Sequence, residues 1–421
     1  MTSLNSFRAV WPLALAIASP HLAFGGDWPQ WQGPNRDAVS AETGLLAEWP
    51  SGGPPLVWKV NGLGGGYSTP SIAGGRIFGM GYIGEEEVVW ALDAKTGKSL
   101  WNVPIGPADR RIGYPEGSRC TPTVDGELLY ALGPGGNFIC LETATGKERW
   151  RKDFKQDFGG RMMSGWGFSE SPLVDGDRVV CTPGSSKGTI LALNKKTGAV
   201  IWQTKDFTDR SAYSSIIPVE MGGVRQYVQL TDQSVVGVAA NDGRLLWRAP
   251  RQGRTAVIPT PIFHDNHVYV TSGYNVGCNL FKITATGGEF KAEEVYANND
   301  MVNHHGGVVR VGEYLYGFSD RGGWTCQEFK TGKVVWKNGG VGKGSILCAD
   351  GHLYLRSEGS KGTLALVAAT PDGYKETGRF DQPDRSGKQS WPHPVIANGK
   401  LFLRDQDILL CYDVMKKERL N

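Results

Sequence analysis

The chain has 421 residues, of which 45 are Lys or Arg and 42 are Asp or Glu, so its formal net charge is +3. The charges are spread along the chain, and no run of basic residues indicates a nucleic-acid partner. Glycine is abundant, with 59 residues, and 14 of the residues are Trp. Turn residues combined with large flat side chains are typical of many short strands.

The first 25 residues have the organisation of a cleavable export signal. Arg8 supplies a short basic region, residues 9–18 form an apolar run, and Ala23 and Gly25 are small residues at the positions that a signal peptidase reads. A short buried helix is the alternative interpretation. The apolar run is too short to span a bilayer, and no Cys follows it to carry a lipid anchor. We therefore expect a mature protein in the periplasm or another extracytoplasmic compartment.

A sequence motif recurs along the rest of the chain. It consists of a small residue, an acidic or amide residue two positions later, then Thr-Gly and finally an aromatic residue; the stretch from Ala91 to Trp101 is the clearest copy. An apolar strand, a Gly-containing turn and a second strand precede each copy, as in residues 70–78. The closing aromatic residues recur about every 46 residues, and the last and third-last are the least certain matches. They are Trp58, Trp101, Trp150, Trp202, Trp247, Tyr296, Trp336 and Phe380.

A period in the forties with four strands predicts the blade of a β-propeller. No stretch carries the 3.6-residue apolar period of a helical repeat. Residues 56–60 end a blade whose first three strands are absent before it, whereas the strands after Pro394 lack a fourth. We therefore predict an all-β fold over residues 55–421, a single eight-bladed propeller of four-stranded antiparallel blades. The N-terminal strand completes the C-terminal blade, and residues 26–54 form an N-terminal extension.

The recurring Trp residues are predicted to be structural. A Trp at the end of each outer strand can lie flat against the neighbouring blade, where its burial contributes roughly 2–3 kcal/mol. The acidic residue, such as Asp93, can accept turn amides, and the Gly of the motif takes a positive φ. Cys140, Cys326 and Cys411 share the phase of Ala91 and are expected to be small buried fillers. The docking set is Trp58, Trp101, Trp150, Trp202, Trp247 and Trp336.

The motif from Ala91 to Trp101 resembles the tryptophan-docking motif of the pyrroloquinoline-quinone (PQQ)-like propellers. The resemblance covers nearly all of the chain after the export signal. One branch of that superfamily consists of quinoprotein alcohol dehydrogenases. Another consists of cofactor-free propellers, typified by the lipoprotein of the bacterial outer-membrane barrel-assembly machinery. The segment from Trp28 to Pro34 and the overall layout are most similar to exported propellers of this superfamily.

The dehydrogenase branch implies a vicinal disulfide stacked on the quinone, a calcium ion and a catalytic Asp. The sequence has no adjacent pair of Cys. Glu170 and Asn303 are candidate calcium ligands, but one acid offers few oxygens to a cation that takes six or more. We therefore expect no cofactor. The alternative is a quinoprotein-type oxidoreductase that binds PQQ and calcium in the central channel.

Histidine pairs give no metal site. His264 and His267 flank a predicted hairpin turn, and zinc would need further ligands there. His304 and His305 precede an innermost strand, so one of the two is expected to face the channel as a hydrogen-bonded side chain.

Loop lengths point to one face of the propeller as the binding face. The turns within each hairpin of a blade are short, whereas the connections on the opposite face vary and include residues 106–118, 152–165 and 381–390. Variable loops on a rigid scaffold commonly carry binding sites. The channel mouth on that face is predicted to collect a ligand-binding set: Tyr67, Arg119, Trp166, Glu170, Tyr213, His304, His305, Trp391 and His393. The other interpretation is that these groups fill the channel and bond to one another and to water.

The sequence favours a binding or scaffold protein of the cell envelope over an enzyme. Its expected partner is a protein, a peptide or a small ligand at the variable-loop face. A monomer is expected, without a transmembrane segment, a metal site or a nucleic-acid partner.

Overall fold

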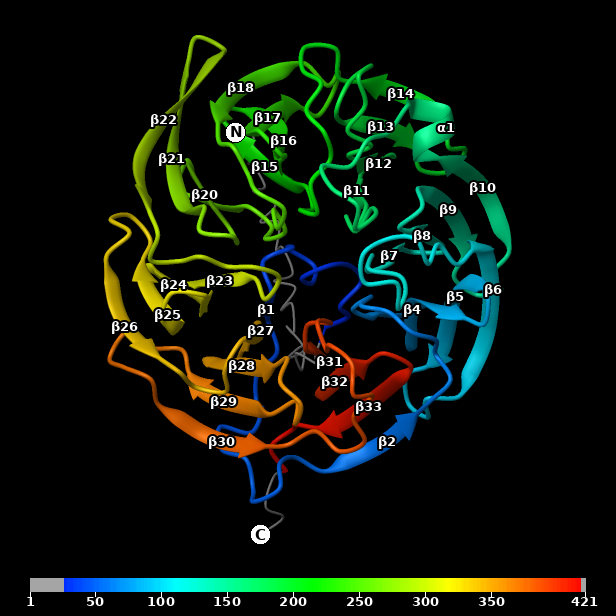
Figure 1. The fold of residues 1–421 in the computed structure, drawn as a ribbon, viewed down its shortest axis with the longest axis vertical. Coiled ribbons are helices and arrows are strands. Elements are labelled where there is room, and N and C mark those ends of the chain that lie inside the picture. The colour runs from blue at the N-terminus through cyan, green and yellow to red at the C-terminus, as the bar shows by residue number, and fades with distance from the viewer. Residues whose placement is uncertain (1–25, 418–421) are drawn as a thin grey trace, which may run out of the picture.

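The computed structural model describes residues 26–417, and it shows eight antiparallel sheets arranged around a central channel (Figure 1). Blade 1 consists of β3 (Ser71–Ala73), β4 (Arg76–Ile83), β5 (Glu86–Asp93) and β6 (Ser99–Pro107), and blade 2 consists of β7 (Thr123–Asp125), β8 (Leu128–Leu132), β9 (Asn137–Glu142) and β10 (Glu148–Asp153). Blade 3 consists of β11 (Leu173–Asp175), β12 (Arg178–Cys181), β13 (Leu191–Asn194) and β14 (Val200–Gln203), and blade 4 consists of β15 (Ile217–Met221), β16 (Val224–Leu230), β17 (Ser234–Ala239) and β18 (Leu245–Pro250). Blade 5 consists of β19 (Ile262–His264), β20 (His267–Ser272), β21 (Gly277–Thr286) and β22 (Glu289–Asn298), and blade 6 consists of β23 (Val308–Val311), β24 (Tyr314–Ser319), β25 (Gly323–Glu328) and β26 (Val334–Asn338). Blade 7 consists of β27 (Gly344–Ala349), β28 (His352–Ser357), β29 (Leu364–Ala368) and β30 (Glu376–Phe380), and blade 8 consists of β31 (Val395–Ala397), β32 (Lys400–Asp405), β33 (Ile408–Asp413) and β2 (Leu56–Val60). This architecture confirms the predicted fold class.

Ring closure also follows the prediction. Strand β2 pairs antiparallel with β33, with Lys59 opposite Leu410 and Val60 opposite Leu409. Figure 1 shows the blue strand β2 beside the red strand β33 in this blade. The N-terminal strand therefore covers the edge that β33 would otherwise expose.

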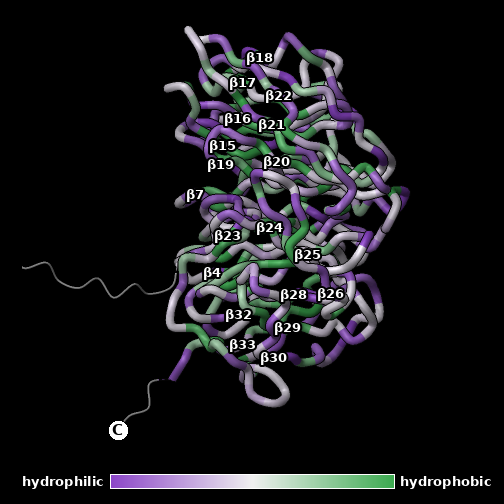
Figure 2. Tube along the Cα trace, turned by 90° about the vertical axis from the view of Figure 1, so that its left-hand side faces the viewer, coloured by the Kyte–Doolittle hydropathy of each residue, from purple (hydrophilic) through white to green (hydrophobic). Residues whose placement is uncertain are grey.

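The apolar core lies between neighbouring blades. Figure 2 shows hydrophobic segments within the disc and hydrophilic ones mainly at its periphery. One short helix, α1 (Phe154–Phe158), interrupts the strand pattern. The carboxylate of Asp153 accepts the amides of Lys155 and Gln156 at its first turn, and Gly159 ends it in the left-handed conformation. No helix in residues 26–417 is long and apolar enough to cross a membrane.

The recurring aromatic residues occupy equivalent places in the outer strands. Trp150 lies opposite Cys140 in its own blade, and its indole Nε1 donates to the carbonyl of Lys195 in the next blade at 3.0 Å. Gly198 of that neighbouring turn leaves room for the ring, because a Cβ there would lie 2.8 Å from it. Equivalent donations join Trp101 to Thr143 and Trp202 to Ala240, both at 3.1 Å.

Blades 4, 7 and 8 depart from this pattern, and in blade 8 the indole nitrogen of Trp58 has no hydrogen-bond partner within residues 26–417. Trp247 donates to Gln226 Oε1 of its own blade at 2.9 Å. In blade 7 the position opposite the small-residue site is Gly378, not Phe380, and a Cβ on Gly378 would lie 2.6 Å from Trp49. The N-terminal extension therefore supplies the aromatic ring that this blade lacks, and Trp49 packs against Phe380 at a centroid distance of 5.2 Å.

Each outer strand carries a β-bulge immediately before the position that holds the closing aromatic residue in most blades. One residue of each outer strand therefore has no partner on the neighbouring strand. The bulged residues are Val57, Leu100, Arg149, Ile201, Leu246, Val295, Val335 and Thr377. Five of them are exposed aliphatic side chains: Val57, Leu100, Ile201, Val295 and Val335.

The N-terminal extension crosses the channel instead of standing apart from the propeller. Its strand β1 (Val39–Ser40) pairs in parallel with β27, the innermost strand of blade 7. Trp28 forms a bridge with Ile72 of blade 1, and the guanidinium of Arg36 donates to the carbonyls of Ser171 and Pro172 at blade 3. Figure 1 shows this dark-blue segment running through the centre of the ring.

Candidate functional site

A cavity of about 590 Å³ opens at the channel mouth. Its walls come from the connections on the variable-loop face and from the beginnings of the innermost strands. The lining residues are Trp31, Tyr67, Thr69, Tyr114, Arg119, Trp166, Ser169, Tyr213, Ser215, Ile258, Tyr274, His304, His305, Lys343, Glu358, Gly359, Gln389, Trp391 and His393.

The N-terminal extension reaches this cavity from the opposite face. Asp27 accepts the amide of Gly74 and the side-chain amide of Asn398, which belong to short hairpin turns of blades 1 and 8. Four residues further along, the indole of Trp31 donates to Thr260 Oγ1 at 2.9 Å and lines the cavity. The cavity is therefore bounded by the extension on the short-turn side, and it opens on the variable-loop side.

Five aromatic rings form a continuous arc around the mouth. Tyr67 and Trp391 lie 4.6 Å apart between ring centroids, and Trp166 and Tyr213 lie 5.4 Å apart, each pair with an interplanar angle of 31°. Tyr114 connects the pairs, at 4.8 Å from Trp391 and 5.6 Å from Trp166. Tyr114 is partly exposed, so the arc presents ring faces and edges to a ligand.

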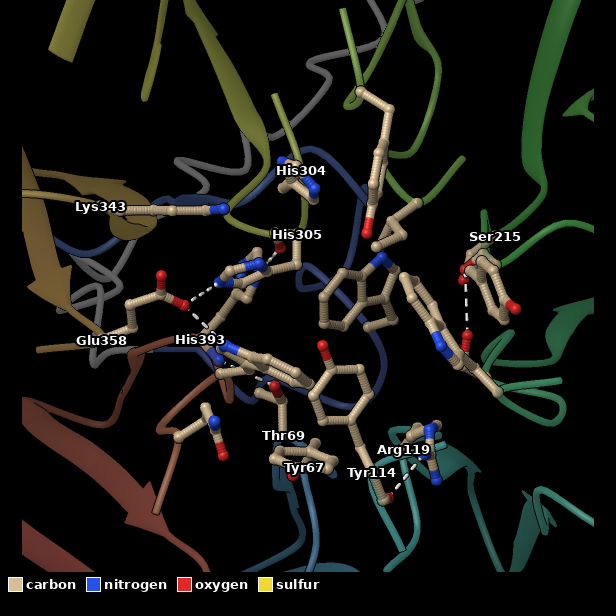
Figure 3. Close-up of a pocket in the computed structure, with 18 of the residues that line it drawn as sticks. Tyr67, Thr69, Tyr114, Arg119, Ser215, His304, His305, Lys343, Glu358 and His393 are labelled. Carbon is tan, nitrogen blue, oxygen red and sulfur yellow. Dashed lines mark hydrogen bonds and ion pairs between the residues drawn. The ribbon is translucent and has the colours of Figure 1, made fainter. Parts of the chain in front are cut away.

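A carboxylate on the other side of the cavity is held ionised. Glu358 Oε2 accepts the indole Nε1 of Trp391 at 2.6 Å and lies 3.2 Å from His305 Nε2 (Figure 3). Although burial acts to raise it, the contacts with His305 and Trp391 and the charge of Lys343 lower the pKa of Glu358 to about 2. Burial lowers the pKa of His305 below its usual value. We therefore assign an ionised Glu358 beside a neutral His305 at pH 7.

A second polar pair lies next to the first. His304 Nδ1 is 2.5 Å from Asp320 Oδ2, and Lys343 Nζ is 3.4 Å from the other carboxylate oxygen of Asp320. The ring of His304 also lies 4.9 Å from that of Tyr274. Lys343 and His304 thus have an acidic neighbour within the wall.

Arg119 and His393 are oriented by backbone carbonyls. The Arg119 guanidinium donates to the carbonyls of Gly113, Tyr114 and Gly117, and it lies 5.7 Å from the ring of Tyr67. His393 Nε2 lies 2.9 Å from the carbonyl of His305, so it carries the proton. Burial lowers the pKa of His393 to about 4, which makes it neutral at pH 7.

The structure brings eight of the nine predicted mouth residues to this cavity, and Glu170 is the exception. Glu170 is 1% exposed, and its carboxylate accepts the amide and the hydroxyl of Thr182 at 2.6 and 2.9 Å. Burial raises the pKa of Glu170 to about 7, against the opposing effect of those hydrogen bonds and of Arg36. Side chains alternate along an extended segment, so Ser169 faces the cavity while Glu170 points into the blades.

Several lining residues were not expected from the sequence. Tyr114 and Gln389 belong to the long variable connections between blades, and the length of those loops was the signal that could have located them. Lys343 directly precedes β27, and Glu358 directly follows β28. In an antiparallel hairpin the start of the first strand and the end of the second strand lie at the same end of the blade. Their positions in the chain therefore predict that Lys343 and Glu358 lie close together. Trp31 had no such signal.

The two candidate calcium ligands do not fit the calcium site that the dehydrogenase branch implies. The carboxylate of Glu170 is saturated by Thr182 and Gln229, and the amide of Asn303 bonds to the backbone of Gly307 and Phe318. Neither side chain lines the cavity, and residues 26–417 contain no group of three or more His, Cys, Asp or Glu placed to hold a metal ion. Seven separate buried Cys occupy the described chain, and none of them pairs as a disulfide there.

Comparison with known proteins identifies the family. The family model described as "Outer membrane protein assembly factor BamB" matches residues 85–338, more than half of the chain. The chain belongs to this family.

The chain is also similar in sequence to distant curated relatives, among them members of the BamB-type family. BamB of Shewanella oneidensis is 24% identical over 67% of this chain and 60% of its own length, and BamB of Burkholderia pseudomallei is 27% identical over 52% and 66%. The serine/threonine-protein kinase AfsK of Streptomyces griseus is 30% identical over 42% of this chain and 20% of that protein. The chain thus spans from a fifth to about two thirds of these relatives.

Solved structures show the same fold at low sequence identity. BamB from Moraxella catarrhalis superposes with a TM-score of 0.59 and 14% identity, covering 85% of this chain and 99% of that one. Quinohemoprotein alcohol dehydrogenase from Comamonas testosteroni superposes with a TM-score of 0.64 and 11% identity, covering 94% and 81%. Because members of the BamB-type family and dehydrogenases share this fold, the fold alone does not select a function.

Proposed function

We propose that this protein is an exported, cofactor-free propeller that acts as a binding or scaffold protein in the cell envelope, with its ligand site at the channel mouth. The observation that carries the proposal is the cavity itself. Loops and strand ends from most of the blades converge on it, and aromatic rings and polar groups line it without a recognisable metal-binding or nucleophilic arrangement among the described residues.

Family membership supports a location outside the cytoplasm. Curated relatives carry the name outer membrane protein assembly factor, which is a role in the cell envelope. The apolar segment at residues 9–18, which lies outside the described residues, supports export of this chain. We extend a place in the cell envelope to this protein, with the mature chain starting at or near Gly26.

A photo-crosslinking experiment tests the proposed face. A photoreactive phenylalanine replaces Tyr114 at the cavity mouth, and in a matched variant it replaces Lys147, an exposed residue of a short turn on the opposite face. Irradiation of whole cells followed by mass spectrometry of the purified protein is expected to give adducts at residue 114 and none at residue 147. Adducts confined to residue 147 would refute the assignment of the binding face.

The quinoprotein alternative is tested separately. The purified mature protein is mixed with PQQ and Ca²⁺, passed through a desalting column and examined by visible absorption. We expect no retained chromophore, because Glu170 and Asn303 are engaged by protein groups. A stoichiometric bound quinone would overturn the cofactor-free proposal.

A further inference from the structure

We infer that the cavity binds the terminal sugar units of a neutral glycan. This inference rests on the proposed function, because it names the ligand class of the same site. It is carried by three features of the cavity: its single opening, the arrangement of its aromatic rings, and the pairing of its charges.

The single opening favours the end of a chain over its middle. The extension that carries Trp31 bounds the cavity on the short-turn side, so a polymer cannot pass through the channel. A peptide that binds by adding a β-strand to a sheet needs a free sheet edge. The edges of the outer strands lie away from the cavity, and on the inner side β27 is already paired with β1 while Trp28 bridges Ile72 of β3. The cavity is instead of the size that accommodates small molecules.

The aromatic rings offer flat surfaces at two places on the rim. Tyr67 with Trp391 forms one surface, Trp166 with Tyr213 forms the other, and Tyr114 lies between them. A pyranose ring has an apolar face made of C–H groups and an equator of hydroxyls. Such a ring can lie against an indole or phenol while its hydroxyls reach the polar groups beside it.

The polar groups of the wall match hydroxyls better than they match an ionic ligand. Glu358 is ionised beside His305 and Lys343, Lys343 lies near Asp320, and the Arg119 guanidinium already donates to three carbonyls. Arg119 and Lys343 are cationic whereas Glu358 and Asp320 are anionic, so the wall as a whole favours a strongly charged ligand of neither sign. Hydroxyl groups both donate and accept, so they can bond to Glu358 Oε1, to Lys343 and to the amide of Gln389, which all line the cavity.

The test is calorimetric titration of the mature protein with soluble oligosaccharides. The probes are four neutral tetrasaccharides, cellotetraose, maltotetraose, mannotetraose and chitotetraose, together with the anionic tetragalacturonic acid. We expect saturable binding of at least one neutral probe and at least tenfold weaker binding of the anionic probe. Binding of no neutral probe, or preferred binding of the anionic probe, overturns the inference.

Two variants locate the binding site. Trp391→Ala removes one of the stacked rings of the arc and is expected to weaken the binding of the neutral probe by about tenfold or more. Tyr114→Ala truncates a partly exposed loop side chain, which keeps the test valid if the first variant is unstable. The matched control is Leu100→Ala, an exposed aliphatic residue of outer strand β6, which should bind as the unmodified protein does. Equal affinity in all three variants would overturn the inference.

The outcomes also separate this inference from the proposed function. If no neutral sugar binds but residue 114 crosslinks to a protein or peptide, the glycan inference fails and the binding face stands. If neither sugars nor crosslinks are found, both fail.

Discussion

His393 shows how a single buried side chain links the cavity to the stability of the fold. It lies 4.7 Å from the ring of Trp31, and its Nε2 donates to the carbonyl of His305, so it connects the extension to the mouth of the channel. Burial lowers the pKa of His393 to about 4, whereas an unfolded histidine titrates near 6.5. The unfolded state therefore takes up the proton first as the pH falls.

We predict that His393 contributes stability above pH 6.5 that is lost between about pH 6.5 and pH 4. The full effect is roughly 3 kcal/mol, because each pKa unit corresponds to about 1.4 kcal/mol. Buried Glu87 and Glu170, whose pKa values burial raises to about 7, act in the opposite direction over a similar range. The measurement is therefore the difference in urea unfolding free energy between the unmodified protein and His393→Gln at several pH values. A difference that does not shrink as the pH falls from 7 to 4.5 would contradict the assignment.

The outer-strand Trp residues test the contacts between blades at the residue scale. Trp202 is largely buried and donates to the next blade, whereas its neighbour Ile201 is the exposed bulge residue. We expect Trp202→Ala to reduce the free energy of unfolding by about 3–5 kcal/mol, as large aromatic truncations in cores do. Ile201→Ala should change it by less than about 0.5 kcal/mol. Chemical denaturation of the two variants checks this contrast, and similar costs for both would refute a docking role for Trp202.

At the scale of elements, the short strand β2 is expected to contribute strongly to the stability of the closed ring. It supplies the outer strand of blade 8, and Trp58 lies opposite Cys411 there. Deletion of residues 55–60 is expected to lower the melting temperature far more than the double variant Leu56→Ala and Val57→Ala, which changes two exposed side chains and keeps the backbone pairing. Thermal unfolding by circular dichroism measures both. A deletion variant that melts like the unmodified protein would show that β2 does not stabilise the ring.

The blades were predictable from sequence because their information is local. Apart from blade 7, each repeat carries its own strand alternation, its own turn and its own closing aromatic residue, as Ala91 to Trp101 illustrates. The extension carries no such repeat, and the partners of Trp31, Arg36 and Trp49 lie more than 100 residues away in the chain. Only the closed ring brings those partners together. The aromatic ring at the Gly378 position could not be predicted for the same reason, because it belongs to Trp49, which is distant in the chain.

The candidate site was predictable to the extent that it follows blade topology. Residues just before an innermost strand, such as His304 and Trp391, were placed at the mouth and line the cavity. The orientation of a side chain was not predictable where alternation decides it, and Glu170 points into the blades for that reason. The floor of the cavity also depends on Trp31, whose position only the folded chain determines.

At the scale of the whole molecule, the seven Cys residues provide a test of how closely the blades pack. All seven are buried and unpaired in the structure. Burial raises the pKa of the Cys140, Cys348 and Cys411 thiols to about 12, so these thiols are protonated and unreactive at pH 8. We expect an aromatic disulfide reagent to modify almost no thiol in the native protein and all seven in urea. Fewer than seven thiols after unfolding would reveal a disulfide, and rapid labelling of the native protein would reveal looser blades.

The bulge that recurs in all eight outer strands also bears on how molecules of this protein behave toward one another. A propeller closes its ring but still leaves one strand edge per blade at its circumference. An uninterrupted edge can pair with the edge of another molecule and so start an extended intermolecular sheet. Here the unpaired residue, Ile201 in blade 3 for example, breaks the regular spacing of amides and carbonyls along each edge. The same irregularity that precedes the aromatic position thus makes each outer edge a poorer template for pairing with another copy of the protein.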